Sequence, residues 1–285
     1  MSKENRAGDP PAVYQVALPL SSKTLTAVVQ AIGTHRKKVK SRWRKKTDYQ
    51  AALIVLGHLR HDQRLADLAG GNNISTATVR RWTHQALAIL AARAPRLQRA
   101  LARARTRSEY VLLDATLIRS TRRHGHTGRR TYNGKHHAHG LAFSILTDPI
   151  GNLLSISKAR PGRTHDATAA RADHLPDRLR HADLGAVADL IYTALDPDRD
   201  NPTILTGRRN TNARKLTAAE TFTNLVLSAE RAANEHPLSY LKNWRILTKL
   251  RSSHRNATTL LRALMVLTQI ENPRTQKPLP NPTGK

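Results

Sequence analysis

Two aspartates interrupt apolar runs that otherwise have the composition of buried β-strands. Asp114 lies within residues 110–118 (YVLLDATLI), and Asp189 lies within residues 185–192 (GAVADLIY). A carboxylate in a dry interior must meet a cation, a hydrogen-bond network or a metal ion. Two converging carboxylates could hold Mg²⁺, which prefers oxygen ligands and promotes phosphodiester cleavage by activating the attacking oxygen and stabilising the leaving one. The alternative, that each aspartate is buried with one of the many arginines, fits the residue types equally well.

The charge of the chain indicates a polyanionic partner. The 285 residues include 48 Lys and Arg but 20 Asp and Glu, which gives a formal net charge of +28 at pH 7. Basic blocks without any acid occupy residues 10–47, 115–147 and 236–270. A single block of this kind is usually a solvated face, but three blocks along the whole chain favour a continuous phosphate-binding surface.

The composition also excludes several classes of protein. The chain has no cysteine, which rules out a disulfide scaffold, an iron–sulfur cluster, a Cys-ligated zinc site and a Cys nucleophile. It has no apolar run of about 18 residues that could span a membrane, and its N-terminus lacks the apolar segment of a signal peptide. We therefore expect a cytoplasmic, nucleic-acid-binding protein with no membrane partner.

Residues 48–106 have helical periodicity, and about residues 48–92 predict a helix-turn-helix. Asp48 can cap the first helix, Gly70 and Gly71 can end a short helix with positive φ, and Ser75 stands at the N-cap of a basic helix. In that geometry, base edges and phosphates would be contacted by Thr76, Thr78, Arg80 and Arg81. The alternative is a plain helical bundle with a basic surface.

From residue 110 the pattern becomes β-rich. Four strands are expected, at residues 110–118, 140–147, 153–159 and 185–192. The turn sequence at residues 148–151 joins the second and third strands as a hairpin, and a helix starts at Thr164. A capping box from Thr217 to Glu220 opens a later helix. This order predicts an α/β fold in which the two aspartates can converge.

Five segments carry a resemblance to a known family: VLLDATLI, YNGKHHAHG, DPIGNLLSISKARPGRTHDATAAR, ADLIY and EHPLSYLKNWRILTKLR. They resemble the motifs of DDE-type insertion-sequence transposases, in particular an actinobacterial group whose nuclease domain is related to Harbinger-type DDE endonucleases. The resemblance spans about residues 45–270. It implies an α/β fold with an RNase H-like mixed sheet flanked by helices, preceded by an all-α helix-turn-helix domain. We expect a DNA-binding domain at residues 1–107, a nuclease domain at residues 108–271 and a disordered tail at residues 272–285.

The resemblance also implies an activity. It indicates a DNA transposase that binds terminal inverted repeats and performs strand cleavage and strand transfer with two Mg²⁺ or Mn²⁺ ions per active site. Its partners would be double-stranded DNA, as repeats and target, and at least a second copy of the chain during synapsis, at the bacterial nucleoid. Two alternatives remain: a catalytically decayed DNA-binding protein or repressor at the repeats, and a general metal-dependent nuclease.

The catalytic and metal-binding residues of the family can be carried over one by one. Asp114 matches the aspartate of the Leu-Asp-x-Thr motif, Asp189 matches the second aspartate, and Glu235 matches the glutamate of the Glu-His-x-Phe-x-x-Leu-Lys motif. The chain departs from the pattern at Ile191, where the family has glycine, and at Pro237, where it has a small residue. An isoleucine there would crowd the backbone beside a ligand, and a proline beyond the first helical turn would break the helix.

The remaining candidate DNA contacts are basic residues of the three blocks: Arg36, Lys37, Lys38, Arg44, Lys45, Lys135, Lys242, Arg245 and Lys249. An unbroken helix would place Glu235, Lys242, Arg245 and Lys249 on one side. The histidines between residues 124 and 139 could instead form a zinc site, but phosphate contacts around Lys135 are favoured because a glycine-rich loop promises no fixed metal geometry. His165 and Asp166 recur in the resemblance, either capping a helix or supporting the active site.

Overall fold

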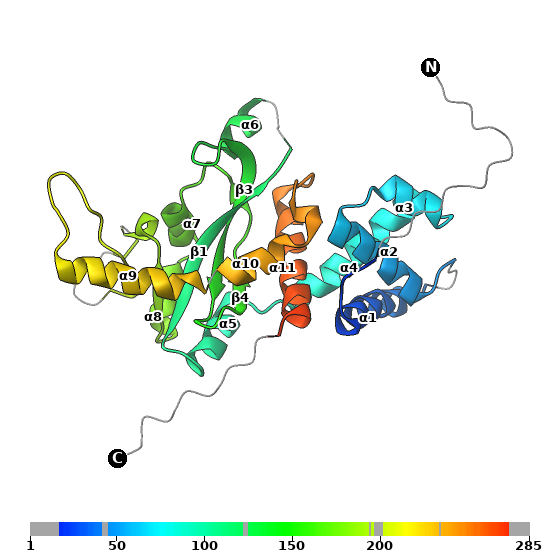
Figure 1. The fold of residues 1–285 in the computed structure, drawn as a ribbon. Coiled ribbons are helices and arrows are strands. Elements are labelled where there is room, and N and C mark those ends of the chain that lie inside the picture. The colour runs from blue at the N-terminus through cyan, green and yellow to red at the C-terminus, as the bar shows by residue number, and fades with distance from the viewer. Residues whose placement is uncertain are drawn as a thin grey trace, which may run out of the picture.

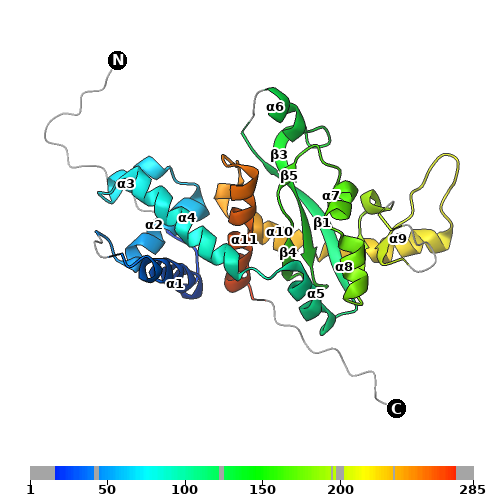
Figure 2. The ribbon, with the colours of Figure 1, turned by 180° about the vertical axis from the view of Figure 1, so that it is seen from behind.

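A helical N-terminal part lies beside a mixed sheet that is flanked by helices (Figures 1 and 2). The structure is a computed structural model, and it describes residues 17–41, 45–121, 125–193, 195–196, 202–233 and 235–273. The expected tail, residues 272–285, falls almost entirely outside these ranges. None of the helices in the described ranges has both the length and the hydropathy needed to cross a membrane.

The N-terminal part consists of five helices: α1 (Ser22–Lys38), α2 (Asp48–His61), α3 (Leu65–Gly71), α4 (Thr76–Arg93) and α5 (Leu97–Arg105). Ser75 caps α4, as expected, by accepting a hydrogen bond from the Thr78 amide. The expected cap at Asp48 is wrong by one residue, because Thr47 caps α2 in a capping box with Gln50. The left-handed residue after α3 is Asn73 rather than a glycine.

Arg36, an expected DNA contact, is instead part of the packing between these helices. Its side chain is buried, forms an ion pair with Asp48 at the start of α2, and donates a hydrogen bond of 3.1 Å to the Lys46 carbonyl. Its guanidinium also lies 5.4 Å from the ring centroid of Trp82 in α4. These contacts remove Arg36 from the surface that DNA could reach.

The sheet has seven strands: β1 (Tyr110–Arg119), β2 (Tyr132–Asn133), β3 (Ala138–Thr147), β4 (Leu153–Ile156), β5 (Arg160–Pro161), β6 (Gly185–Ala188) and β7 (Ile204–Thr206). The order is β2-β3-β1-β6-β7, and β4 and β5 also pair with β3. The expected hairpin of β3 and β4 is confirmed, and Gly151 in its turn has a φ of 85°. The last expected strand is shorter than predicted, because the chain leaves the sheet after Ala188.

The helices of this part are α6 (Gly125–Thr131), α7 (Asp166–Ala172), α8 (Leu175–His181), α9 (Ala218–Ala232), α10 (Glu235–Lys242) and α11 (His254–Glu271). Two 3₁₀ turns lie between them, η1 (Leu190–Tyr192) and η2 (Arg245–Leu247). The capping box of Thr217 and Glu220 opens α9, as expected.

The expected unbroken helix from Glu235 to Lys249 is wrong. α10 ends at Lys242, and the next residues turn so that Trp244 is buried, with its indole N–H donating to the Thr268 hydroxyl at 3.0 Å. Arg245 and Lys249 therefore do not share a helix with Glu235. Pro237 is harmless where it stands, because it lies in the first turn of α10, where backbone amides have no intrahelical acceptor.

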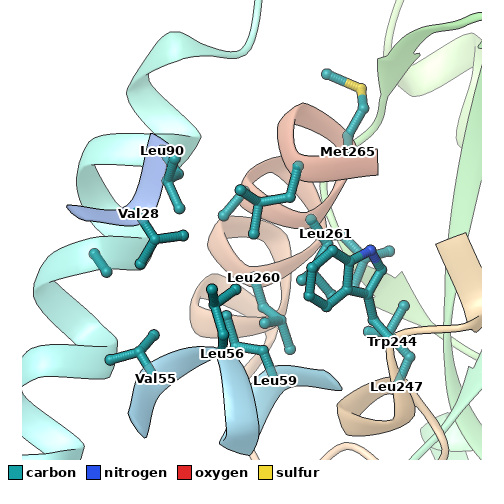
Figure 3. Close-up of a cluster of buried hydrophobic side chains, with 14 of the residues drawn as sticks. Val28, Val55, Leu56, Leu59, Leu90, Trp244, Leu247, Leu260, Leu261 and Met265 are labelled. Atoms are coloured by element: carbon teal, nitrogen blue, oxygen red, sulfur yellow. The ribbon is translucent and has the colours of Figure 1, made fainter. Parts of the chain in front are cut away.

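Two hydrophobic clusters hold these elements together. The first joins α1, α2 and α4 to α11 and to one side of β3 and β4, and Figure 3 shows Leu56 and Leu59 of α2 beside Leu260 and Leu261 of α11. The second packs α5, α7 and α8 against Leu113 and its neighbours on the other face of the sheet (Figure 2). Because α5 packs with the sheet and α11 with the N-terminal helices, each cluster crosses the expected division at residues 107 and 108. That division stays a prediction.

We expect Asp48→Asn to destabilise the protein by about 3 kcal/mol, because it leaves the buried Arg36 guanidinium without its counter-charge. Urea unfolding monitored by circular dichroism measures this change in the free energy of unfolding. Asp67→Asn, at an exposed position in the first turn of α3, is the control and should change stability little. Equal stability of the two variants would show that Arg36 does not depend on Asp48.

Candidate active site

Asp114 in the middle of β1 and Asp189 just after the end of β6 follow directly on the last residue pair of these two strands. β1 and β6 are parallel neighbours, and their last paired residues are Leu113 and Ala188. The next residue on each strand is an aspartate, so the pairing register brings the two carboxylates to the same level. Leu113 and Ala188 both belong to the cluster under α7 and α8, which fixes this register by burial.

Each aspartate accepts a hydrogen bond from the backbone amide of the next residue. The Ala115 amide donates to Asp114 Oδ1 at 2.8 Å, and the Leu190 amide donates to Asp189 Oδ1 at 2.7 Å. The second bond makes Asp189 the N-cap of η1, which is why β6 ends there. Within the described residues, Oδ2 of each aspartate accepts no hydrogen bond, so both carboxylates keep one oxygen for a ligand.

Asp114 and Asp189 line a cavity of about 300 Å³, and a third aspartate, Asp166, lines it too. It is the first residue of α7, and the preceding His165 occupies the N-cap position without a capping hydrogen bond from its side chain. The wall also includes the cationic and polar side chains of Lys135, His136, Arg163, His165 and Asn133, together with apolar residues such as Leu117 and Ile191. Sequence reasoning left Asp166 without an assigned role, and its recurrence in a family motif was the available signal.

The surroundings of the cavity disfavour the ionised forms of Asp114 and Asp166. Burial raises the pKa of the Asp114 carboxyl, and the carboxylates of Asp189 and Asp166 add to this rise against the Ala115 amide and Arg231. Burial likewise raises the pKa of Asp166, with Asp189 adding to it and His165, Lys135 and His136 opposing it. The ionised forms of Asp114 and Asp166 are therefore less favoured here than in water unless a cation joins them.

One arginine serves the two strand aspartates. Arg231 of α9 places Nη1 3.5 Å from Asp189 Oδ1, and its charge opposes the rise in the pKa of Asp114. The alternative in which each aspartate has its own arginine therefore does not describe this cluster. Arg231 Nε is buried and has no hydrogen-bond partner among the described residues, so the guanidinium is not held in a full bidentate pair.

The family model of the DDE superfamily endonucleases matches residues 113–269. The chain belongs to this superfamily. The match includes both strand aspartates, the cavity and α10, and members of the superfamily use divalent metal ions to cleave DNA. A search of the curated proteins and a search of the solved structures each found no match. Membership indicates phosphoryl transfer on DNA, and the mixed α/β sheet with flanking helices is consistent with a DDE nuclease fold.

The donor chemistry of this DDE endonuclease suits a hard divalent ion, because the cavity offers carboxylate oxygens rather than sulfur. Across the described ranges, no three Asp, Glu, His or Cys side chains converge tightly enough to hold a metal ion. This finding also gives no support to a zinc site at His136, His137 and His139. Mg²⁺ commonly keeps several waters, which bridge it to carboxylates that stand further away.

Glu235, the third expected ligand, is the first residue of α10. The placement of its side chain lies outside what the structure describes, so its role as a ligand stays a prediction. The nearby Glu230 makes a structural contact instead: its Oε2 accepts a hydrogen bond of 2.6 Å from the Tyr110 hydroxyl. Burial and this bond raise the pKa of Tyr110 to about 12.

Most of the candidate DNA contacts are exposed. These are Lys37, Lys38, Lys45, Arg80, Arg81, Lys135, Lys242, Arg245 and Lys249. Thr76 and Thr78 are partly exposed, and the Thr78 hydroxyl lies 2.9 Å from the hydroxyl of the capping Ser75. Arg44 falls outside the described residues. Arg80 of α4 and Lys249 line a common cavity of about 690 Å³ between α2, α4 and α11. Arg80 and Lys249, far apart in the sequence, thus lie on the same cavity.

We expect Asp114→Asn to stabilise the metal-free protein at neutral pH. Because folding raises the pKa of Asp114, the wild type loses stability as the pH rises from the unfolded pKa through the folded pKa, whereas the amide does not. The gain should vanish below roughly pH 3, where both forms are neutral. Denaturant unfolding in EDTA, from roughly pH 3 to neutral pH, measures this difference in the free energy of unfolding. Destabilisation by Asn at neutral pH would instead mean that ionised Asp114 serves a structural ion pair.

Proposed function

We propose that this DDE endonuclease is a DNA transposase, which binds the terminal inverted repeats of its element and carries out metal-dependent strand cleavage and strand transfer. The observation that carries the proposal is the register of β1 and β6, which sets Asp114 and Asp189 side by side in a chain of this superfamily. Its substrates would be repeat DNA and target DNA at the bacterial nucleoid. Pairing of two element ends would bring at least two copies of the chain together.

In the proposed active site, Asp114, Asp189 and Glu235 would hold two Mg²⁺ or Mn²⁺ ions. Such ions supply activation of the attacking water or 3′-hydroxyl and stabilisation of the leaving oxygen. The Ala115 and Leu190 amides orient the aspartates, and Lys135 and Arg163 on the cavity wall neutralise the incoming phosphates. Ile191 does not oppose this assignment, because it lies in η1 without a positive φ that would call for glycine.

Recognition of the repeats is assigned to the N-terminal helices. α3 and α4 would form the helix-turn-helix, with Thr76, Arg80 and Arg81 near the start of the Ser75-capped helix reading the DNA. The exposed lysines 37, 38 and 45 add affinity without sequence preference, since phosphate contacts position the protein but do not specify the site.

Cleavage of a duplex that carries the flanking inverted repeats tests the proposal. We expect Mg²⁺-dependent nicking at the repeat ends, and Glu235→Gln should reduce it by at least roughly 10³-fold because it removes a ligand. DNA affinity, measured by gel shift, should stay near that of the wild type, since loss of an acid lessens the repulsion of phosphate.

Glu230→Gln is the matched control for this cleavage experiment. Glu230 lies on α9 and accepts its hydrogen bond from Tyr110, so its amide variant should retain cleavage. The reverse result would move the third acid from α10 to α9. Equal cutting of unrelated duplexes would favour a general nuclease, and tight repeat binding without any cutting would favour a decayed DNA-binding protein.

The two parts of the DNA-binding surface should respond differently to substitution. Changing Lys37, Lys38 and Lys45 together to Gln should weaken binding to every duplex and lower the slope of log K against log salt by about 3. Arg81→Gln should instead reduce the preference for repeat DNA over random DNA, by about 1–3 kcal/mol. Fluorescence anisotropy at several salt concentrations measures both. Equal losses for every sequence in both variants would contradict the helix-turn-helix assignment.

A further inference from the structure

Helix α9 presents an apolar side to solvent. Its positions i, i+3, i+4 and i+7 form one exposed stripe, called the α9 stripe below: Phe222, Leu225, Val226 and Ala229. In the described part of the chain, Phe222 and Leu225 are the most exposed large apolar side chains, at 67% and 66%. Single exposed apolar residues are common, but a contiguous stripe on one helix face indicates a surface that another molecule covers.

The opposite side of α9, which faces the sheet, is mostly polar. Its half-buried positions are Glu220, Asn224, Leu227 and Arg231. Asn224 ties the helix to the segment after β7, because its Oδ1 accepts from the Arg208 amide and its Nδ2 donates to the Arg208 carbonyl, each at 2.8 Å. Surface helices normally turn their apolar side to the protein, so the pattern of α9 is inverted. Polar contacts hold the helix in place and leave the apolar side without a partner in this chain.

The α9 stripe is unsuited to DNA. Residues 216–230 contain no Lys or Arg, although the whole chain has 48 of them. Duplex DNA is bound chiefly through its phosphates, which need cations or hydrogen-bond donors, and the four stripe side chains offer neither. A protein surface with its own apolar residues suits the stripe better.

The α9 stripe is complementary to itself when two copies of the helix pack antiparallel. A two-fold axis between Leu225 and Val226 sets these two residues opposite each other across the pair. The same axis sets Phe222 of one copy opposite Ala229 of the other. A large side chain then faces a small one at each end of the stripe, which allows two helices to approach closely.

The charges at the two ends of α9 favour the same antiparallel arrangement. Before the helix, residues 208–215 carry four exposed cations, and two of them share the single carboxylate of Glu220. At the other end, Glu230 is exposed and has no ion pair among the described residues, only its hydrogen bond from Tyr110. Antiparallel packing brings the basic start of one helix to the acidic end of the other, whereas parallel packing sets like charges together.

We propose that the α9 stripe is the contact between two copies of this chain, related by a two-fold axis with their α9 helices antiparallel. The inference rests on the exposure and charges of α9 and not on the proposed cleavage of DNA. Figures 1 and 2 show α9 at the end of the molecule opposite to helices α1–α4. Two copies joined at α9 therefore leave both sets of N-terminal helices free. Under the proposed function, each set would hold one end of the element.

Sedimentation velocity of the full-length protein without DNA tests the proposal, in roughly 0.5 M salt to screen the repulsion between two cationic chains. The wild type should form a reversible dimer whose fraction rises with concentration up to roughly 100 μM. Leu225→Glu should raise the dissociation constant by at least roughly tenfold, because it places a charge in the apolar contact. Its circular dichroism should match that of the wild type, since Leu225 is mostly exposed in one chain.

Leu53→Glu is the matched control for this measurement. It makes the same substitution at an exposed leucine of α2, outside the α9 stripe, and should leave the dimer unchanged.

Disulfide cross-linking measures the direction of the two helices, because the chain has no cysteine of its own. The double variant Phe222→Cys with Ala229→Cys should form a covalent dimer under mild oxidation, since the two positions lie opposite each other. Ala229→Cys alone should stay unlinked, because its two copies would lie about 10 Å apart along the helix axis.

Four results would overturn the inference. A wild type that stays monomeric over the whole range would show that no second copy covers the α9 stripe. A dimer that survives Leu225→Glu would place the interface elsewhere, and loss of fold in this variant would give the stripe a role within one chain. Cross-linking of Ala229→Cys alone would contradict the antiparallel arrangement. None of these results concerns the strand aspartates, so the proposed cleavage activity stands or falls separately in its own test.

Discussion

The parallel pairing of β1 with β6 is the constraint on which the rest of the structure depends. This pairing ends at Leu113 and Ala188, where β6 leaves the sheet while β1 continues beside β3, and an aspartate follows each of the two last paired residues. Helices α5, α7 and α8 bury the residues just before this point, so a slip of register by one residue would turn apolar side chains out of the cluster. The position of the acids is therefore set by hydrophobic burial and not by the acids themselves.

Gathering carboxylates in this way works against folding. Burial and mutual repulsion raise the pKa values of Asp114 and Asp166, and a single arginine offsets only part of the charge. The protein tolerates this local cost because two hydrophobic clusters tie α4 to α11 and the sheet to its helices. Such strain at a functional site, compensated by packing elsewhere, is a common feature of enzymes.

Local patterns in the sequence predicted local structure well, and long-range partners escaped them. The strand around Asp114, the hairpin that follows it, the Ser75 cap and the capping box of α9 all depend on neighbouring residues, and the structure confirms them. Nothing within the run of cations indicates that Arg36 is buried against Asp48 and Trp82. The helix break after Lys242 depends on a pocket for Trp244 formed by α11, and the position of Asp166 at the cavity depends on strands distant from it in the sequence.

The cluster of three aspartates is unusual in a chain whose formal net charge is +28. The net charge favours a polyanionic partner, whereas the cavity at the end of β6 brings three carboxylates together beside Lys135 and Arg163. A divalent cation reverses the sign of the field at that point, because a bound ion is the largest local charge in such a site. In the proposed function, binding of the ion and binding of DNA would therefore be coupled electrostatically. Under the proposed function, basic side chains would attract the DNA strand, and a divalent ion bound by the acids would favour entry of its phosphate into the cavity.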